Sequence, residues 1–547
     1  MFSFFASYFF ENTNDLQTND LQTNNFNNFN NFNNFVYSKT DNNAVALETT
    51  NNIFLDLFTN IVRDFNYQEL DILLHKCMKE DPYKTIAIIM NSRDRINGKK
   101  EKKISNDAYL WLKFNKYEKT YECNIKNYLN KYGSWKDILY FITKIFKNKT
   151  YNDSFEIKLF AEQLIEDKNN FENEKPVSLC AKWCPSENSM YQKRYNVNHK
   201  ISYEILNLTN NYSFLKNKNY FFRKEYLTPL RNKIDIVEKK MCSGEWKNIN
   251  YECVPSIATK KYKNAFMNND SERYLQYLTN VSKGIQKINF TGILPHELVN
   301  YYLENENKEI DLTIENQWSA ILNDMKKTKL FDDLIAVVDV SGSMFSASNG
   351  SIPAQVAIAL GLLISNCCNG SFKNKIITFH SNPSFHQVIG LTLKEQVESI
   401  RNAYWGHNTN FELIADLIID YGINNSLTND TMPKKLVVLS DMQFDDAIKK
   451  NYDSDKQELE LLYHTFSKKF EKNMFEVPKM IYWNLNSDNS KSFPVDSKVK
   501  NTALISGFSE QLLKIFMTYD DFNPEIILDA ILAQYIKDIY VYPDEIY

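Results

Sequence analysis

The chain has 547 residues, of which 43% are hydrophobic and 14% aromatic, and its formal net charge is −4 at pH 7. This length exceeds what one hydrophobic core serves, so two or three domains are expected. No apolar run reaches the ~18 residues of a membrane span, and residues 2–10 lack the basic start and cleavage site of a secretion signal, so neither class of protein is expected.

The small net charge hides a division along the chain. Residues 176–300 carry 19 Lys and Arg against 10 Asp and Glu, whereas residues 331–547 carry 18 against 28. The middle of the chain therefore suits a polyanionic partner, and the C-terminal part would repel one. Cys180 and Cys184 lack a matching second pair, so the eight cysteines are interpreted as free thiols of a reducing compartment rather than as zinc ligands.

The first 50 residues are of low complexity. Asp-Leu-Gln-Thr-Asn occurs twice, at 15–19 and 20–24, and Asn-Asn-Phe then repeats as far as Phe35. Because tracts of asparagine and phenylalanine cannot build a varied core, a disordered head is predicted over 1–50.

Helical periodicity begins at residue 51. Phe54, Leu57, Phe58 and Ile61 keep the i, i+3, i+4, i+7 spacing of an amphipathic helix, and Asp81-Pro82 marks a break before the next one. Short helices separated by such breaks predict an all-α helical-repeat module over 51–330.

The remainder alternates between apolar strands and helices. Residues 334–338 and 435–439 are continuous apolar runs of the kind buried on both faces of a parallel sheet. Further strands are predicted at 375–380, 387–391, 480–485 and 502–506, and helices at 353–367, 393–403, 411–421 and 455–472, before two closing helices. The alternation predicts a doubly wound α/β domain over 331–547.

Oxygen-bearing side chains follow the strands of this domain. Asp339, Ser341 and Ser343 stand where the first strand ends, Thr409 lies in a later loop, and Asp441 follows another strand. Ligands of open α/β sheets bind at the carboxyl ends of the strands. Carboxylates and hydroxyls gathered there suit Mg²⁺ or a similar hard cation.

This set resembles the metal-ion-dependent adhesion site of von Willebrand factor A domains. That family is marked by Asp-x-Ser-x-Ser after the first strand, a threonine loop in mid-domain and an aspartate after a later strand. The resemblance implies that Ser341, Ser343 and Thr409 contact the cation directly and that Asp339 and Asp441 act mainly through bound water. One coordination position is then left for an acidic group of a partner.

No catalytic constellation accompanies the site. A phosphatase of the haloacid-dehalogenase type is an alternative for Asp339, but it needs a second aspartate two residues later, where this chain has Ser341. Neither a phosphate-binding Gly-Lys loop nor a nucleophile elbow is present. A non-enzymatic protein is therefore expected.

The helical module joined to such a domain resembles the Ro ribonucleoproteins, whose helical repeats form a ring, the TROVE domain. The resemblance is closer to an uncharacterised relative family found in plants, fungi, amoebae and large DNA viruses. It is carried by residues 92–102, 132–137, 178–188, 254–256 and 440–445. Lys100 stands where those relatives usually have glycine.

Ro-type rings bind single-stranded RNA ends and structured small RNAs, so the resemblance implies phosphate contacts from the helical module. The candidate residues are Arg93, Arg95, Lys99, Lys100, Lys102, Lys182, Arg194, Arg223, Lys224, Lys260 and Lys261. Trp183, Tyr191 and Tyr262 are candidates for stacking on bases. The ordinary alternative for each basic residue is a solvated surface charge.

These observations favour a cytoplasmic, monomeric RNA-binding or ribonucleoprotein scaffold with a Mg²⁺-dependent interaction domain. The alternative is a protein–protein adaptor, in which the cation grips an acidic partner residue and the helical module binds protein. A metal-dependent hydrolase is a remote third hypothesis.

Overall fold

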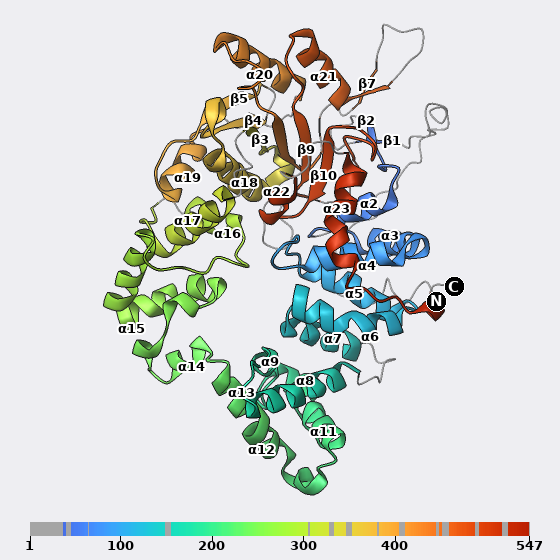
Figure 1. Cartoon of the computed structure of the whole chain (residues 1–547), viewed down its shortest axis with the longest axis vertical. Helices are drawn as coiled ribbons and strands as arrows, with labels where there is room; N and C mark the ends of the chain where they lie inside the picture. Colours follow the sequence, from blue (N-terminus) through green and yellow to red (C-terminus); the bar gives the residue numbers. More distant parts are fainter. Residues whose placement is uncertain are drawn as a thin grey trace, which may run out of the picture.

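The computed structural model describes residues 37–39, 45–63, 65–147, 155–304, 307–327, 333–345, 353–379, 382–403, 411–442, 444, 448–450, 459–486, 492–516 and 523–545. Within these ranges a mostly helical N-terminal region precedes a six-stranded mixed sheet that is accompanied by helices (Figure 1).

The N-terminal region is a succession of short helices that leads away from the sheet and back to it (Figure 1). The helices are α2 (Ile53–Asn60), α3 (Tyr67–Glu80), α4 (Pro82–Arg93), α5 (Lys103–Phe114), α6 (Glu118–Asn127), α7 (Trp135–Lys147), α8 (Phe155–Glu172), α9 (Cys180–Trp183), α10 (Met190–Tyr195), α11 (Val197–Thr209), α12 (Lys218–Phe222), α13 (Thr228–Lys233), α14 (Val237–Cys242), α15 (Ser256–Ser282), α16 (Pro295–Leu303) and α17 (Leu312–Lys326). Local rules set several starts: Asn52, Asp81 and Asp311 cap α2, α4 and α17 with their side chains.

The sheet has the strand order β10-β9-β6-β3-β4-β5. Its strands are β3 (Leu334–Asp339), β4 (Lys375–Phe379), β5 (Ser384–Gln387), β6 (Lys435–Ser440), β9 (Lys479–Asn484) and β10 (Thr502–Ser506). All neighbours from β10 to β4 are parallel, and only β5 runs antiparallel, at the edge. The ends of β3 and β6 therefore lie next to each other in the middle of the sheet.

Helix α18 (Pro353–Cys367) holds β3 in place. A Cβ atom on Gly361 would come within 2.6 Å of Cγ2 of Val338, so only glycine lets the helix lie this close to the strand. The run 334–338 is fully buried, as its unbroken apolar sequence predicts. The other helices of this region are α19 (Leu393–Arg401), α20 (Glu412–Asn424), α21 (Leu462–Lys472), α22 (Gln511–Phe516) and α23 (Pro524–Ile536).

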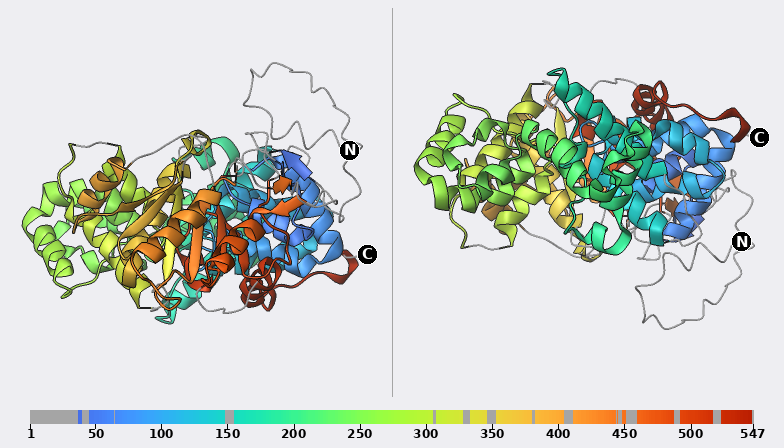
Figure 2. Two further views of the ribbon diagram at one scale, coloured as in Figure 1. Left: turned by 90° about the horizontal axis from the view of Figure 1, so that it is seen from above. Right: turned by 90° about the horizontal axis from the view of Figure 1, so that it is seen from below.

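Both ends of the helical region pack on the sheet region. Helix α4 packs against α23 and α2 against β10, while α16 and α17 pack against α18. The blue N-terminal helices accordingly lie beside the red α23 in every view (Figures 1 and 2). One apolar core extends from Leu47 to Val541 across both regions, and a smaller cluster around Tyr251 and Tyr274 serves the α14–α15 part.

The head predicted over 1–50 is corrected at its end. Strand β1 (Tyr37–Lys39) pairs with β2 (Val45–Leu47), and Leu47 is fully buried, with its backbone paired to Phe493. The reason is tertiary: an apolar Val-Ala-Leu run finds a place in the core that composition alone does not reveal.

Two elements of the sheet region differ from prediction. The short strand expected at 387–391 is Ser384–Gln387, and the helix expected at 455–472 begins only at Leu462. Residues before that helix form β8 (Leu459–Leu461), which pairs antiparallel with β7 (Ile448–Lys450). Residues 459–461 fit the periodicity of the predicted helix, but pairing with β7 places them in a strand instead.

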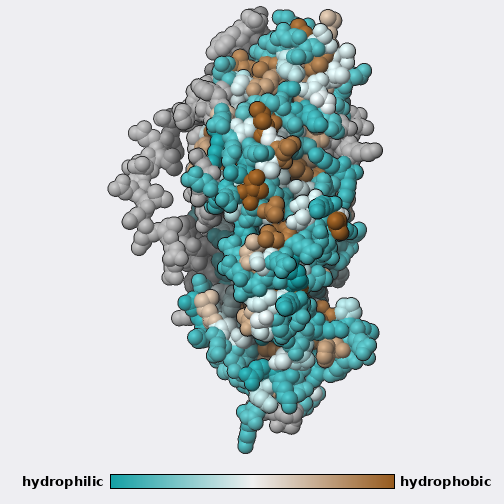
Figure 3. All heavy atoms as spheres, turned by 90° about the vertical axis from the view of Figure 1, so that its left-hand side faces the viewer, coloured by the Kyte–Doolittle hydropathy of each residue, from teal (hydrophilic) through white to brown (hydrophobic). Residues whose placement is uncertain are grey.

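None of the helices in the described ranges is both long and apolar enough to cross a bilayer. The face on the α15 side is mainly hydrophilic, with apolar side chains scattered over it (Figure 3).

Candidate functional site

Asp339 is the last residue of β3, and its carboxylate is buried at the carboxyl end of the sheet. The residue is 1% exposed. Its Oδ1 atom accepts the backbone N–H of Ser341 at 2.8 Å, and its Oδ2 atom accepts the hydroxyl of Ser440 at 2.6 Å. Because Ser440 ends the neighbouring parallel strand β6, this hydrogen bond joins the two strand ends.

Asp441 is the second buried carboxylate of the site, at 4% exposure. Burial and then the charge of Asp441 raise the pKa of Asp339 to about 7, although the hydrogen bonds from Ser440 and Ser341 act in the opposite direction. Met442 adopts a left-handed φ of +66°, and its N–H donates to the Ser440 hydroxyl, which fixes the start of this loop. The carboxylates of Asp339 and Asp441 therefore repel each other, because burial keeps solvent from screening their charges.

Serine hydroxyls lie beside the carboxylates. The Oγ atoms of Ser341 and Ser343 are 3.2 Å apart and share a hydrogen bond. A short 3₁₀ turn, Gly342–Phe345, places Ser343 just beyond the strand. Thr409, the fifth predicted ligand, lies outside the described residues.

The donor set fits a hard divalent cation. It consists of oxygen atoms only, and a cation would relieve the repulsion between Asp339 and Asp441. In the described part of the chain no group of three or more His, Cys, Asp or Glu residues gathers in the manner of a metal site. A cation at these strand ends therefore needs the hydroxyls of Ser341 and Ser343 as well as the acids.

A second constellation surrounds a buried ion pair in the helical region. Arg93, at the end of α4, donates from Nε at 3.0 Å and from Nη2 at 2.6 Å to Oδ2 of Asp137 in α7. The Asp137 carboxylate also accepts the N–H of Ser134 and the side-chain amide of Asn106. The Ser134 hydroxyl also donates to Oδ2 at 3.3 Å, so five donors share this carboxylate.

Further cations lie around this pair without being neutralised by it. Burial lowers the pKa of Arg95, and the charge of Arg93 lowers it further, while the carboxylates of Asp137 and Asp94 act in the opposite direction. Burial also lowers the pKa of Lys102, and the charges of Lys136 and Arg93 add to this although Asp137 opposes it. Such mutual repulsion between cations marks a place where an anion would be stabilised.

Trp183 lies close to two lysines next to this place. The Nζ atoms of Lys136 and Lys182 lie 5.0 Å and 5.8 Å from the centre of its ring. The cations around Trp183 and the Arg93–Asp137 pair are Arg95, Lys102, Lys136 and Lys182. Among the residues that the structure describes, none of these four takes part in a salt bridge. We call the following residues the basic cluster: Arg95, Lys102, Lys136, Lys182 and Trp183.

The other predicted basic residues are spread over the helical region. Arg194 borders a cavity of about 380 Å³ together with Met190 and Lys193. Arg223 and Lys224 are exposed and lie 6.0 Å and 5.9 Å from the ring of Tyr220. Lys261 is exposed and lies 5.0 Å from the ring of Tyr262.

Comparison with known proteins places the chain in a family. A model described as a domain of unknown function, DUF2828, matches residues 40–158 and 156–330, which is more than half of the chain. The chain belongs to the DUF2828 family. A second model, of the domain of unknown function DUF7788, matches residues 333–533.

Relatives of this DUF2828 protein include the uncharacterized protein L728 of Acanthamoeba polyphaga mimivirus. The two are 34% identical over 526 residues, covering 91% of this chain and 88% of the relative. Among solved structures, the Ro (RSR) protein of Deinococcus radiodurans is similar with a TM-score of 0.29 and 10% identity, covering 89% of this chain and 100% of that one.

The structure corrects the predicted set of phosphate-contacting residues at three basic positions of the DUF2828 chain. Arg93 is 4% exposed and is paired with Asp137, and Lys99 is fully buried. The Lys100 side chain is 7% exposed and its Nζ lies 2.8 Å from the Glu510 carboxylate. These three side chains make their polar contacts inside the protein, so they are not available to a phosphate.

Two further features refine the expectations for this region. Lys260 donates to the carbonyl oxygen of Glu297 at 2.8 Å and pairs with its carboxylate, so its charge is partly used. Lys100 has a left-handed φ of +61°, a conformation that glycine adopts without strain and lysine does not.

Lys136 is the functional candidate that sequence reasoning missed. It lies within the Tyr-Gly-Ser-Trp-Lys-Asp motif, but one lysine beside an aspartate gives no sign that it faces Lys102 and Trp183. The available signal was the amphipathic pattern of α7, which buries Trp135 and leaves Lys136 exposed.

Proposed function

We propose that this protein is an RNA-binding or ribonucleoprotein scaffold, in which the helical region holds single-stranded RNA and the sheet region is a von Willebrand A-like, Mg²⁺-dependent interaction domain. The observation that carries the RNA proposal is the basic cluster. The Nζ atoms of Lys136 and Lys182 lie 5.0 Å and 5.8 Å from the centre of the Trp183 ring, and neither lysine has a salt-bridge partner among the described residues.

The cluster combines the two elements that single-stranded nucleic acid requires. Ammonium and guanidinium groups attract the phosphate backbone without regard to sequence. An aromatic ring offers a face on which a base can stack, worth ~1–3 kcal/mol per base. Because the Asp137 carboxylate is already used by Arg93, an added phosphate would meet net positive charge.

The cation site supports the second half of the proposal. Asp339 and Asp441 are buried acids, and burial together with the charge of Asp441 raises the pKa of Asp339 to about 7. Bound Mg²⁺ would offset the repulsion between them and would present an electrophilic position to an outside carboxylate or phosphate. Asp339 and Asp441 supply charge, and Ser341 and Ser343 supply hydroxyl ligands.

Fluorescence anisotropy of a labelled single-stranded RNA against the full chain tests the RNA proposal. We expect binding that weakens steeply with salt between about 50 and 200 mM, with a slope near −0.7 per phosphate contacted. Lys136→Gln and Lys182→Gln should each weaken binding and flatten that slope. Lys158→Gln, at an exposed lysine of α8 outside the basic cluster, is the matched control and should change neither.

Absence of binding at low salt, or equal affinity of all three variants and wild type, would remove RNA from the proposal. The protein–protein adaptor would then be the better hypothesis. In that case a carboxylate-bearing partner should be retained in Mg²⁺ and released by a chelator.

A further inference from the structure

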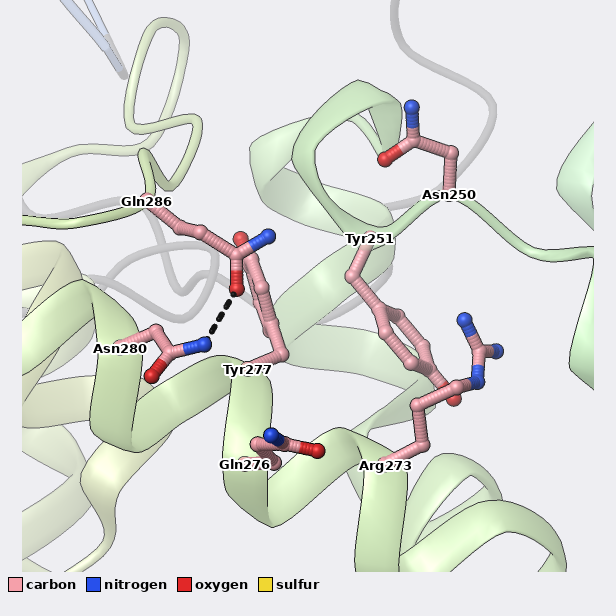
Figure 4. Close-up of a pocket in the computed structure, with 7 residues that line it drawn as sticks. All are labelled: Asn250, Tyr251, Arg273, Gln276, Tyr277, Asn280 and Gln286. Atoms are coloured by element: carbon pink, nitrogen blue, oxygen red, sulfur yellow. Dashed lines mark hydrogen bonds between the residues drawn. The ribbon is translucent and has the colours of Figure 1, made fainter.

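A small polar cavity lies on the helical region at α15, away from the residues of the basic cluster. It measures about 240 Å³. The residues that line it are Asn250, Tyr251, Arg273, Gln276, Tyr277, Asn280 and Gln286 (Figure 4). Four of them come from α15, two from the turn before it and one from the loop after it.

The cavity owes its shape to a kink in α15. Asp270 departs from helical backbone angles, with φ −153° and ψ 46°. Its carboxylate accepts the hydroxyl of Tyr251 at 2.8 Å and Nε of Arg273 at 2.8 Å. The kink therefore fixes one ring and one guanidinium beside each other.

Protein acceptors hold the Arg273 guanidinium in place, and the Asp270 carboxylate neutralises its charge. The remaining donors of Arg273 bond the carbonyl oxygens of Ile249 at 2.8 Å and Trp246 at 2.7 Å, and its guanidinium lies 4.6 Å from the centre of the Tyr251 ring. The side chain is still 38% exposed. A rigid guanidinium plane whose charge is already paired offers a stacking surface rather than a phosphate anchor.

The hydroxyl groups of the two tyrosines that line the cavity are also hydrogen-bonded to protein atoms. The rings of Tyr251 and Tyr277 are stacked at 5.4 Å, and the Tyr277 hydroxyl donates to the carbonyl oxygen of Lys287. Both hydroxyls are thus occupied by protein acceptors. Tyr251 and Tyr277 are each only 4% exposed, so the Arg273 guanidinium, rather than these rings, is the flat surface left to a ligand.

Carboxamides supply the hydrogen-bonding edge. Asn280 donates to the side-chain oxygen of Gln286 at 3.1 Å, as drawn in Figure 4, so the two amides hold each other in place. Within the described residues, the side chain of Gln276 is exposed and has no hydrogen-bond partner. Each carboxamide offers both a donor and an acceptor, and the lining contains no unpaired charge.

We infer that this cavity binds a nucleobase. A planar heterocycle with alternating donors and acceptors matches carboxamides at the edge and the guanidinium plane of Arg273 at the face. The cavity is smaller than the roughly 300–1,000 Å³ pockets that hold drug-sized ligands, which suits one base. The base comes either from a free nucleoside or from a strand of RNA; in the second case the inference rests on the proposed function and adds a base-reading position to it.

Calorimetric titration of the full chain with adenosine, cytidine, guanosine and uridine tests the inference. Nucleosides carry no phosphate, so binding at the basic cluster would rest on Trp183 alone and would not respond to changes at Gln276 or Gln286. We expect at least one to bind, and expect Gln276→Ala and Gln286→Ala to weaken it about three- to tenfold, as the loss of one hydrogen bond predicts. Asn264→Ala, an exposed amide elsewhere on α15, should leave the affinity unchanged, and melting curves should show all variants folded.

The same variants are then measured with single-stranded RNA. If RNA binds and Lys136→Gln weakens it while no nucleoside binds and the two glutamine variants change nothing, the cavity is not a base site and the proposed function survives. If a nucleoside binds through Gln276 and Gln286 but RNA does not bind, the cavity inference stands and the RNA proposal fails. Retention of nucleosides with equal affinity by wild type and both variants also overturns the inference.

Discussion

The Nζ atom of Lys99 lies 2.6 Å from the Oγ atom of Ser506, a residue 407 positions later in the chain. Lys99 belongs to the loop between α4 and α5, and Ser506 ends β10. The same amine donates to the carbonyl oxygen of Phe58, and burial holds the pKa of Lys99 well below its usual value. A lysine from a basic loop thus joins the helical region to the sheet.

Lys99→Ala should destabilise the protein by about 2–4 kcal/mol, because it leaves a cavity and removes a buried donor. Chemical denaturation followed by circular dichroism measures this. The exposed Lys79→Ala on α3 should stay within about 0.5 kcal/mol of wild type. Equal unfolding midpoints for the two variants would contradict the structural role of Lys99.

Mg²⁺ should raise the melting temperature of the full chain. At a concentration 100 times the dissociation constant, binding to the folded state adds about 2.7 kcal/mol. Asp339→Asn should abolish the increment, while in the absence of Mg²⁺ the variant should melt no lower than wild type because the repulsion with Asp441 is relieved. The exposed Asp420→Asn should keep the full increment, and a wild-type curve that ignores Mg²⁺ would refute the cation site.

Trp183→Leu and Lys136→Gln should weaken RNA binding in distinguishable ways. Leucine keeps much of the contact that the half-buried Trp183 makes with the core but offers no ring for stacking, so affinity should fall about five- to tenfold at every salt concentration. The lysine variant should instead reduce the salt slope. Anisotropy titrations at three salt concentrations separate the two effects, and identical slopes for both variants would argue against a phosphate contact at Lys136.

Acid should destabilise the protein through His296. The residue is 4% exposed, its Nδ1 atom has no hydrogen-bond partner among the described residues, and its ring lies 5.4 Å from that of Phe508. Burial, and then the charges of Arg63 and Lys260, lower the pKa of His296 to about 3.

Because the folded pKa lies below the unfolded value of about 6.5, the unfolded chain binds the extra proton between these limits. The contribution to stability is complete above pH 6.5 and is lost as pH falls towards 3, by up to about 1.4 kcal/mol per pH unit. Denaturation of wild type and His296→Phe at pH 7, 6, 5 and 4 measures the difference. Parallel stability curves for the two proteins would show that His296 takes up no proton on unfolding.

Glu545→Ala should destabilise helix α6. That helix has no side-chain cap of its own, and the Glu545 carboxylate accepts the N–H groups of Lys119 and Thr120 at 2.8 Å and 2.9 Å. Loss of such a cap costs about 0.5–2 kcal/mol. The exposed Asp544→Ala should cost less than the Glu545 change, and hydrogen exchange at α6 should quicken only in the latter.

Much of the sheet followed from sequence alone. Continuous apolar runs at 334–338 and 435–439 have no polar face to expose, so they had to be buried on both sides. Parallel strands end at one edge, so Asp339 and Asp441 had to approach each other once β3 and β6 became neighbours. Short-range capping also set the starts of helices. Asp81, directly before Pro82, caps α4 by bonding a backbone N–H group only three residues later.

The fate of the charges was decided only by the tertiary structure. Lys99, Lys100 and Lys102 lie within four positions of one another, yet one is buried at the sheet, one pairs with Glu510, and one joins the basic cluster. The cap on α6 comes from Glu545, more than 400 residues away. Local periodicity reports which face of an element is apolar, but the energy of a charge depends on the partner that the fold brings to it, and that partner is not encoded nearby in the chain.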